Sequence, residues 1–299
     1  MITLKKAIRE AKKNKVAIAH FNISEFVTLK ACWEAALELS QSVGRKIPII
    51  FGTTEHEREF LGNDKEIVAM VKHLRKHYNY PVFLNADHTH KIENAKSAID
   101  AGYDAVIIDE ADKPFADNVA MVREIVQYAR ASKNKKVLIE GEIGFIGAGS
   151  QVHDKLPDGV EITEDTITKP EQAAQFVELT GVDMLAPAVG NVHGMFKDSG
   201  TFTKHLFIKR IKEIRRAAKV PLVLHGGSGT PDEEFLKAID VGVSIIHIST
   251  ELRRALRTGI EKGLHDLPSE VAPYNLLKPA FVDVKAVALA RLKLFNKIN

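Results

Sequence analysis

The sequence of 299 residues contains a single cysteine, Cys32. A fold held together by disulfide bonds is therefore excluded, and a reducing cytoplasm is the simplest compartment. No apolar run approaches the length of about 18 residues that a membrane span needs. Residues 1–6 also lack the apolar stretch of a signal peptide. These absences predict a cytoplasmic protein that does not act in a membrane.

The chain also lacks a marked excess of one charge. Its 42 lysines and arginines stand against 39 aspartates and glutamates, which gives a formal net charge of +3. The basic residues are spread along helical patterns, so we expect no nucleic-acid partner, although a few could serve an anionic small molecule. Low-complexity stretches and an interdomain linker are missing as well. The length fits one large α/β barrel or two smaller domains.

Eight short apolar segments have the composition of buried strands, and helical periodicity follows between them. Strands are predicted at 16–21, 47–51, 81–84, 105–108, 136–140, 183–187, 220–224 and 243–248. Helices are predicted at 25–41, 64–76, 92–101, 118–131, 170–179, 207–218, 231–238, 251–264 and 284–297. This alternation favours an α/β fold, a (β/α)8 TIM barrel, over an open doubly wound sheet. We expect one barrel domain over 1–299, with 267–299 as a C-terminal helical extension.

Polar side chains follow four of the predicted strands. His88, His193 and His225 each come shortly after a strand, and Glu142 follows another. The carboxyl ends of all strands of a barrel meet at one mouth, so we expect these side chains to lie together. Three imidazoles that leave a fourth position open are typical of a catalytic zinc site.

The segment Leu222-Val-Leu-His-Gly-Gly-Ser-Gly229 adds a second feature to this mouth. Its glycines allow close approach of the backbone to an anion, and successive N–H groups can bind a phosphate. The alternative is a core histidine before an ordinary strand–helix turn. Together with the other histidines, the segment favours a metal beside a phosphate.

Four motifs on this pattern carry a resemblance to a known family. They are Asn85-Ala-Asp-His88, Ile139-Glu-Gly-Glu-Ile-Gly144, Gly190-Asn-Val-His-Gly194 and Leu224-His-Gly-Gly-Ser-Gly229. In their order and spacing, the chain resembles the class II, metal-dependent ketose-bisphosphate aldolases. The resemblance implies a Zn²⁺ enzyme that reversibly cleaves a phosphorylated ketose, by default fructose 1,6-bisphosphate. The products would be dihydroxyacetone phosphate and an aldehyde, glyceraldehyde 3-phosphate in the default case.

The resemblance also implies roles for single residues. Asp87 matches the aspartate that exchanges a proton with the substrate C4 oxygen. The metal positions match His88, His193 and His225, with Glu142 and Asp109 at a second or alternate position. The substrate positions match Asn22, Gly194, Lys197, Gly226, Gly227, Ser228, Ser249 and Thr250. A monovalent cation near Gly194 and a homo-oligomer, dimer or tetramer, are further implications of the resemblance.

The chemistry of this cleavage agrees with the residues. Breaking the C3–C4 bond leaves negative charge on the three-carbon fragment, which Zn²⁺ stabilises as a Lewis acid without a lysine Schiff base. A base must also take the C4 hydroxyl proton, and Asp87 suits that task. Consecutive side chains of a strand alternate in direction, so Asp87 and His88 can both reach the mouth only where the strand bends.

Two departures from the family pattern concern the substrate. His247 stands where the family has an asparagine, and it can still donate a hydrogen bond. Tyr274 stands where many members have an arginine that binds a distal phosphate. Arginine binds phosphate through two parallel hydrogen bonds, which tyrosine cannot form. The candidates to replace that arginine are Arg253, Arg254 and Lys278.

A third departure concerns the loop after Glu142, which lacks the family's catalytic glutamate. We assign its proton transfer to His153 or Asp154, which lie on a glycine-flanked loop able to close. The alternatives are that Glu161 or a water molecule transfers this proton, or that the loop is only a lid.

Three functions stay open on these residues. The first is the aldolase, including a variant for an unphosphorylated aldehyde. The second is a metal-dependent sugar-phosphate epimerase that uses the same chemistry without cleaving a carbon–carbon bond. The third is a non-catalytic sugar-phosphate binder, which has no need of an open zinc site.

Overall fold

The barrel is present in the computed structural model, which describes residues 2–147, 151–156, 162–196 and 203–298. Within these residues eight parallel strands close into a barrel, which confirms the predicted fold and excludes the open sheet. Their order around the barrel is β1-β10-β9-β7-β5-β4-β3-β2. They are β1 (Ile18–Asn22), β2 (Ile49–Thr53), β3 (Val82–Thr89), β4 (Ala105–Ile108), β5 (Leu138–Ile143), β7 (Met184–Pro187), β9 (Leu222–Leu224) and β10 (Val243–Ile248).

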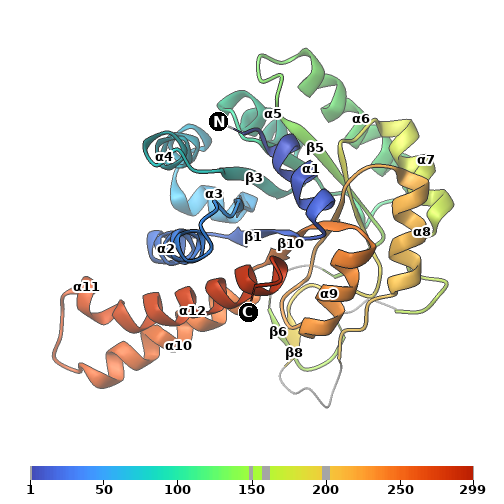
Figure 1. The fold of residues 1–299 in the computed structure, drawn as a ribbon. Coiled ribbons are helices and arrows are strands. Elements are labelled where there is room, and N and C mark those ends of the chain that lie inside the picture. Colours follow the sequence, from blue (N-terminus) through green and yellow to red (C-terminus); the bar gives the residue numbers. More distant parts are fainter. Residues whose placement is uncertain (1, 148–150, 157–161, 197–202, 299) are drawn as a thin grey trace.

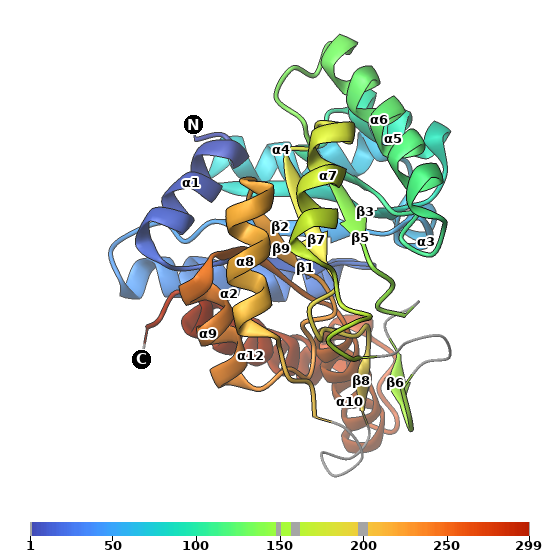
Figure 2. The same ribbon diagram turned by 90° about the vertical axis from the view of Figure 1, so that its right-hand side faces the viewer.

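Helices surround the barrel (Figure 1). The predicted ones are α2 (Phe26–Ser42), α4 (Asp64–His77), α5 (Ile92–Ala101), α6 (Phe115–Ala131), α7 (Pro170–Thr180), α8 (Ile208–Ala218), α9 (Asp232–Val241) and α10 (Thr250–Asp266). A short helix, α3 (Glu55–Leu61), and a small sheet of β6 (Val152–His153) and β8 (Met195–Phe196) were not predicted. Figure 2 shows this small sheet apart from the barrel strands. In the described part of the chain, no helix has the length and apolar character of a membrane span.

The amino-terminal helix α1 (Leu4–Asn14) closes one end of the barrel. Thr3 caps it by accepting a hydrogen bond from the Lys6 N–H. Its buried residues recur every three or four positions and so form one apolar face. This face packs on Ile18, Ile50, Phe83, Ala105, Leu138, Met184, Val223 and Ile245, all near the amino-terminal ends of their strands. The barrel therefore has an apolar floor.

The interior changes from apolar to polar toward the other end. Inward-pointing residues alternate along each strand, so each second residue lies one layer higher. Ile18 of β1 pairs with Ile245 of β10, and two residues later His20 pairs with His247. Gly52 of β2 makes room for His20, because a Cβ at Gly52 would lie 1.9 Å from its imidazole ring. Polar side chains are thus concentrated at the mouth.

The C-terminal segment forms an antiparallel hairpin with α10 (Figure 1). The short helix α11 (Pro273–Leu276) lies at its far end, and α12 (Lys278–Phe295) returns along α10 and packs on α2. The two long helices approach closely, since a Cβ at Gly259 of α10 would lie 2.2 Å from the Ala280 Cα of α12. The last helix begins at Lys278, earlier than the predicted residue 284, because Pro279 is compatible with a first helical turn.

Candidate metal centre

Strand β3 bends at Asp87 and His88. Its pairing with β4 shifts register between Ala86 and Thr89, and the backbone φ of His88 is 40°. Such a bulge places two consecutive side chains on the same side. Asp87 and His88 accordingly line one pocket at the barrel mouth. A positive φ is uncommon for a residue with a side chain, so the surrounding contacts hold this conformation.

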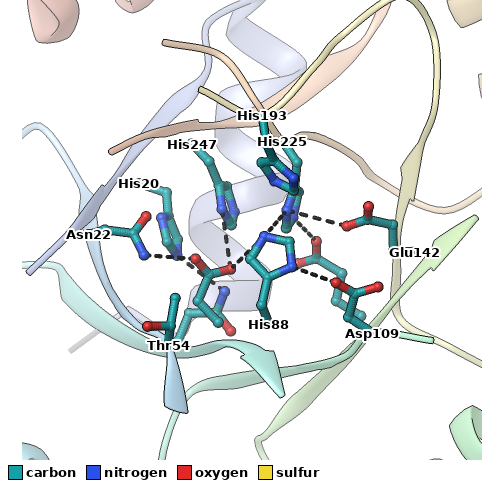
Figure 3. Close-up of polar contacts among 12 residues, drawn as sticks. His20, Asn22, Thr54, His88, Asp109, Glu142, His193, His225 and His247 are labelled. Atoms are coloured by element: carbon teal, nitrogen blue, oxygen red, sulfur yellow. Dashed lines mark hydrogen bonds and ion pairs between the residues drawn. The ribbon is translucent and has the colours of Figure 1, made fainter. Parts of the chain in front are cut away.

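Three imidazoles converge beside this bend (Figure 3). His88, His193 and His225 each offer one ring nitrogen within 4.8 Å of the others. His88 Nε2 lies 3.0 Å from His225 Nδ1, and the ring centroids of His88 and His193 are 4.7 Å apart. The structure therefore brings together the three histidines that the sequence predicts at the mouth.

The second ring nitrogen of each histidine contacts an oxygen acceptor. His88 Nδ1 lies 2.7 Å from Asp109 Oδ2. His193 Nδ1 lies 2.6 Å from the carbonyl oxygen of residue 147, and His225 Nε2 lies 2.8 Å from Glu140 Oε1. Such contacts fix the tautomer and orientation of a metal-binding imidazole. They leave His88 Nε2, His193 Nε2 and His225 Nδ1 for a metal ion.

Glu142 adds a carboxylate to this cluster. Its Oε2 lies 3.4 Å from His225 Nδ1 and is buried without a hydrogen-bond partner among the described residues. A buried, unpaired carboxylate oxygen is costly unless a cation or a proton meets it. Glu142 also forms a second possible metal group with His88 and Asp109. Imidazole and carboxylate donors fit a zinc ion, so the residues present suit the metal that the resemblance implies.

Burial shifts the pKa values of the side chains in this cluster. It lowers the pKa of His193 to about 3, with His88 and His225 adding to the shift, so His193 is neutral as a metal ligand must be. Burial, together with Asp109, raises the pKa of Glu142 to about 8. At His88 burial acts in the opposite direction, but Asp87 and Asp109 raise the pKa well above its usual value. The carboxylates around His88 therefore favour a positive charge at this position.

Asp87 is held as an ionised carboxylate. Burial raises the pKa of its carboxyl group, but His88, His247 and His20 together outweigh burial and hold the pKa well below its usual value. Asp87 Oδ2 accepts a hydrogen bond of 2.8 Å from the Asn22 amide, and Oδ1 lies 3.4 Å from His247 Nδ1. Oδ1 has no full hydrogen bond among the described residues. Asp87 can thus accept a proton through an oxygen that its neighbours leave available.

His247 belongs to a column of stacked imidazoles. Its ring lies 3.4 Å from that of His20 and 3.9 Å from that of His225, measured between centroids. Burial lowers the pKa of His247 well below its usual value, and burial lowers that of His20 to about 4. These two rings are therefore neutral and can stack without charge repulsion. His247, which is predicted to bind substrate, therefore links His225, a candidate metal ligand, to Asp87.

A narrow pocket at the mouth, which we call the donor pocket, is lined by most of the residues predicted to bind substrate. Its lining includes Asp87, His88, His193 and Thr54. It also includes the predicted substrate residues Asn22, Gly194, Gly226, Gly227, Ser228, His247, Ser249 and Thr250. The remaining predicted residue, Lys197, lies outside the described residues. Ser228 Oγ accepts hydrogen bonds from the N–H groups of Ser249 and Glu251, which joins the loops after β9 and β10.

A larger cavity of about 590 Å³ adjoins the donor pocket and shares Thr54, His88 and His193 with it. Arg253 lines this cavity and pairs with Glu57, at 2.7 Å. Tyr274, by contrast, is 75% exposed on α11. Arg253, one of the residues predicted to replace the family's phosphate-binding arginine, thus lies beside the mouth.

The two loop residues occupy a different place. His153 lies in β6, next to β8, and a Cβ on Gly194 would lie 2.4 Å from its Nε2. Neither His153 nor Asp154 is among the residues that line the two pockets of the mouth. Their catalytic role stays a prediction, and the alternative Glu161 lies outside the described residues.

The sequence reasoning missed several side chains of the site. Glu140 holds His225, Glu57 lies 3.2 Å from the Asn22 amide, and His20 stacks on His247. Glu140 had a visible signal, because it stands two residues before Glu142 and therefore points to the same side of β5. Glu57 had none, since it lies on the short helix α3 that the pattern did not indicate.

Comparison with known proteins decides the family. The family model described as "Fructose-bisphosphate aldolase class-II" matches residues 2–299. The chain belongs to this family. It is 33% identical over 298 residues to a "Fructose-bisphosphate aldolase" of Geobacillus stearothermophilus, covering 99% of this chain and 97% of that protein. It is 32% identical over 301 residues to a "Probable fructose-bisphosphate aldolase" of Bacillus subtilis, covering 100% of this chain and 99% of that protein.

A solved structure is also similar over its whole length. The YdjI aldolase of Escherichia coli K12 aligns with a TM-score of 0.79 at 27% identity, covering 99% of this chain and 97% of that one. This class II aldolase family member thus shares its barrel and its length with its relatives.

Proposed function

We propose that the protein is a zinc-dependent lyase that reversibly cleaves fructose 1,6-bisphosphate to dihydroxyacetone phosphate and glyceraldehyde 3-phosphate. One observation carries the proposal: three imidazoles with free nitrogens meet an ionised carboxylate and a glycine-rich loop in one mouth. The family match over residues 2–299 and the names of the relatives support the same reaction. An epimerase and a non-catalytic binder lack such support.

The metal would be held by His88 Nε2, His193 Nε2 and His225 Nδ1, with Glu142 at a second or alternate position. When bound, a divalent ion there supplies Lewis-acid stabilisation to the ketose carbonyl oxygen. The protein's part is to keep His193 neutral and to orient the rings through their second nitrogens.

Asp87 is the proposed base for cleavage. It takes the C4 hydroxyl proton while the C3–C4 bond breaks, and in the reverse direction it returns that proton to the new hydroxyl oxygen. The Asn22 amide keeps one carboxylate oxygen in place, and the low pKa of Asp87 keeps it ionised. The second proton transfer, at C3, is assigned to His153 or Asp154. If His153→Ala and Asp154→Ala each left turnover unchanged, this assignment would be lost.

The donor phosphate is assigned to the glycine-rich loop. Gly226, Gly227 and Ser228 line the narrow pocket with Gly194, Ser249 and Thr250, and Lys197 is assigned to the same phosphate from the sequence. We further propose that Arg253 binds the distal phosphate, since it lines the adjoining cavity and Tyr274 does not. Arg253→Ala should then raise KM for the bisphosphate far more than for a ketose 1-phosphate.

The proposal includes an assembly and a compartment. The exposed apolar residues of the hairpin support a homo-oligomer, and the single, buried Cys32 is consistent with a reducing cytoplasm. We treat residues 1–299 as one barrel domain with 267–299 as its extension, because α12 packs on α2 of the barrel.

The test is release of dihydroxyacetone phosphate from fructose 1,6-bisphosphate before and after treatment with a chelator. Chelation should abolish the reaction, and Zn²⁺ should restore it, while metal analysis gives the ion bound in the purified protein. Chelator-resistant cleavage would contradict the metal mechanism. Chelator-sensitive conversion of the ketose without triose release would favour the epimerase.

Asp87→Asn provides the matched variant for this assay. It removes the proposed base, keeps the side-chain size and should lower turnover by about 100-fold or more. Zinc content should be retained, because the three ligand nitrogens are untouched. Full activity in Asp87→Asn would contradict the assigned base.

A further inference from the structure

A buried lysine lies between the two loops that carry His193 and His225. Lys204 is 1% exposed, and its Nζ contacts four backbone carbonyl oxygens at 2.5–2.7 Å. The oxygens belong to Val192, Gly194, Gly226 and Ser228. Two therefore come from the loop after β7 and two from the loop after β9. We call this group the carbonyl cage.

The carbonyl cage requires a cation. Four carbonyl oxygens that point at one spot bring their negative dipole ends together, an arrangement that proteins use to bind monovalent cations. An ammonium has three N–H donors for these four acceptors, so charge attraction as well as hydrogen bonding must hold them. No carboxylate oxygen is found within hydrogen-bond distance of Lys204 Nζ among the described residues.

The loops have little freedom to rearrange around this cation. Gly226 has a φ of 60°, and a Cβ there would lie 2.4 Å from the Val192 carbonyl oxygen. The backbone that follows Lys204 is fixed as well, since Leu206 N–H donates to Glu234 and Phe207 N–H donates to the Val189 carbonyl. The lysine thus enters the cage from a segment anchored to the loop after β7 and to α9.

The cage also orients the donors of the phosphate loop. In a trans peptide the C=O and the N–H point in opposite directions. The Gly226 carbonyl faces Lys204, so the Gly227 N–H of the same peptide unit points away from it. No acceptor for this N–H is found in the described part of the chain, and Gly227 lines the narrow donor pocket. The Lys204 ammonium on one side of the loop after β9 therefore directs the Gly227 N–H toward the other side.

We propose that Lys204 is a positioning residue whose tethered ammonium takes the place of a monovalent cation at the barrel mouth. The monovalent cation that the family resemblance implies near Gly194 does not fit, because Lys204 Nζ already occupies the carbonyl cage. The ammonium holds the His193 loop against the His225 loop and orients the Gly227 N–H. Burial lowers the pKa of Lys204 to about 7. Glu251 opposes that shift. The cage carbonyls also favour the charged form, because an ammonium offers them three N–H donors and a neutral amine only two.

The wild-type protein gives the first test and needs no substitution. Its thermal unfolding and its activity should stay the same when K⁺ or NH₄⁺ replaces tetramethylammonium at constant ionic strength. Activation or stabilisation of the wild type by K⁺ would overturn the proposal, since a site filled by Lys204 has no room for the ion.

The second test empties the cage with Lys204→Ala and compares it with Lys204→Met. In tetramethylammonium, Lys204→Ala should unfold at a lower temperature, and NH₄⁺ or K⁺ should restore the unfolding temperature. Lys204→Met fills the space with an uncharged chain, so neither ion should restore it. Lys209→Ala, on the exposed surface of α8, is the matched control and should behave as the wild type.

The kinetic readout rests on the proposed aldolase function, whereas the unfolding readout does not. Lys204→Ala should raise KM for dihydroxyacetone phosphate at least tenfold, with a smaller change in kcat, and NH₄⁺ should restore KM. A purely structural role would predict lower stability with no response to small cations, and that result would overturn the proposal. A cation response in unfolding without any aldolase activity would keep the cage and reject the proposed reaction.

Discussion

Glu140 orients His225, a proposed metal ligand, from inside the barrel. Its side chain is fully buried, and its Oε1 lies 2.8 Å from His225 Nε2. A buried carboxylate costs free energy unless it is hydrogen-bonded, and here the contact also fixes which nitrogen His225 offers to a metal. Glu140 and Glu142 stand two residues apart on β5 and point inward together, so one orients a ligand while the other is available as one.

Glu140→Gln should weaken zinc binding by about 10- to 100-fold, because the amide holds the His225 ring less strongly than the carboxylate does. Competition with a chelator of known affinity measures the change. Glu261→Gln, on the exposed side of α10, serves as control. Equal zinc affinity in wild type and Glu140→Gln would show that His225 keeps its orientation without Glu140.

His20 should make the protein sensitive to acid. Burial lowers the pKa of its imidazole from 6.5 to about 4. Between these values the unfolded chain binds a proton at His20 and the folded protein does not, so the free energy of unfolding falls as the pH falls. A shift of this size corresponds to about 3 kcal/mol for this one residue, all of it lost by about pH 4.

Denaturant unfolding at several values between pH 7 and pH 4 tests this expectation in wild type and His20→Phe. Phenylalanine keeps a ring in the space that Gly52 provides but does not titrate. The decrease in stability toward acid should be smaller in the variant. Parallel pH profiles would contradict the assigned role of His20.

At the scale of the element, the strands were predictable because each is a short apolar run with a polar residue at its end. The bend of β3 was also predictable, since Asp87 and His88 could reach the mouth in no other way. The helices α1 and α3 were not predicted, because α1 is rich in charge outside its four buried residues and α3 spans only seven residues. The cage around Lys204 depends on contacts between distant loops, which no local pattern indicates.

The helix α1 offers a test of the division between floor and mouth. Ile8→Ala removes a buried side chain at the floor and should lower the free energy of unfolding by about 2–5 kcal/mol. The ratio kcat/KM should stay within about twofold, because residues at the amino-terminal end of a barrel contribute to stability rather than to catalysis. Calorimetry and steady-state assays measure the two effects, with the exposed Lys5→Ala as control. A large loss of kcat/KM would show that floor and mouth are coupled.

At the scale of the whole molecule, the hairpin of α10, α11 and α12 extends away from the barrel (Figure 1). Its exposed large apolar residues are Leu264, Leu267, Val271, Tyr274 and Val282, with exposures between 42% and 86%. Apolar side chains gathered on a projecting element are typical of an interaction surface. This observation supports the proposed homo-oligomer.

The double substitution Val271→Asp with Tyr274→Asp should shift the protein toward the monomer, because burying two carboxylates in an apolar contact is unfavourable. Analytical ultracentrifugation measures the mass of wild type and variant. Leu179→Asp, an exposed apolar position on α7, should leave the mass unchanged. An unchanged mass of the double variant would place the contact elsewhere on the molecule.

The bend of β3 also limits how this gene can vary in length. Phe83, Asn85 and Asp87 lie at every second position, so their side chains point to the same side of the strand. The side chain of His88 points to that side only because of the register shift between Ala86 and Thr89. Deleting one codon there would restore regular alternation, so the proposed base and the proposed metal ligand could no longer both point into the mouth. Substitutions elsewhere in the strand act on one side chain, whereas a one-residue deletion here acts on the ligand and the base together. We therefore expect homologous genes to tolerate length changes in the loops at the mouth but not within the four codons for residues 86–89.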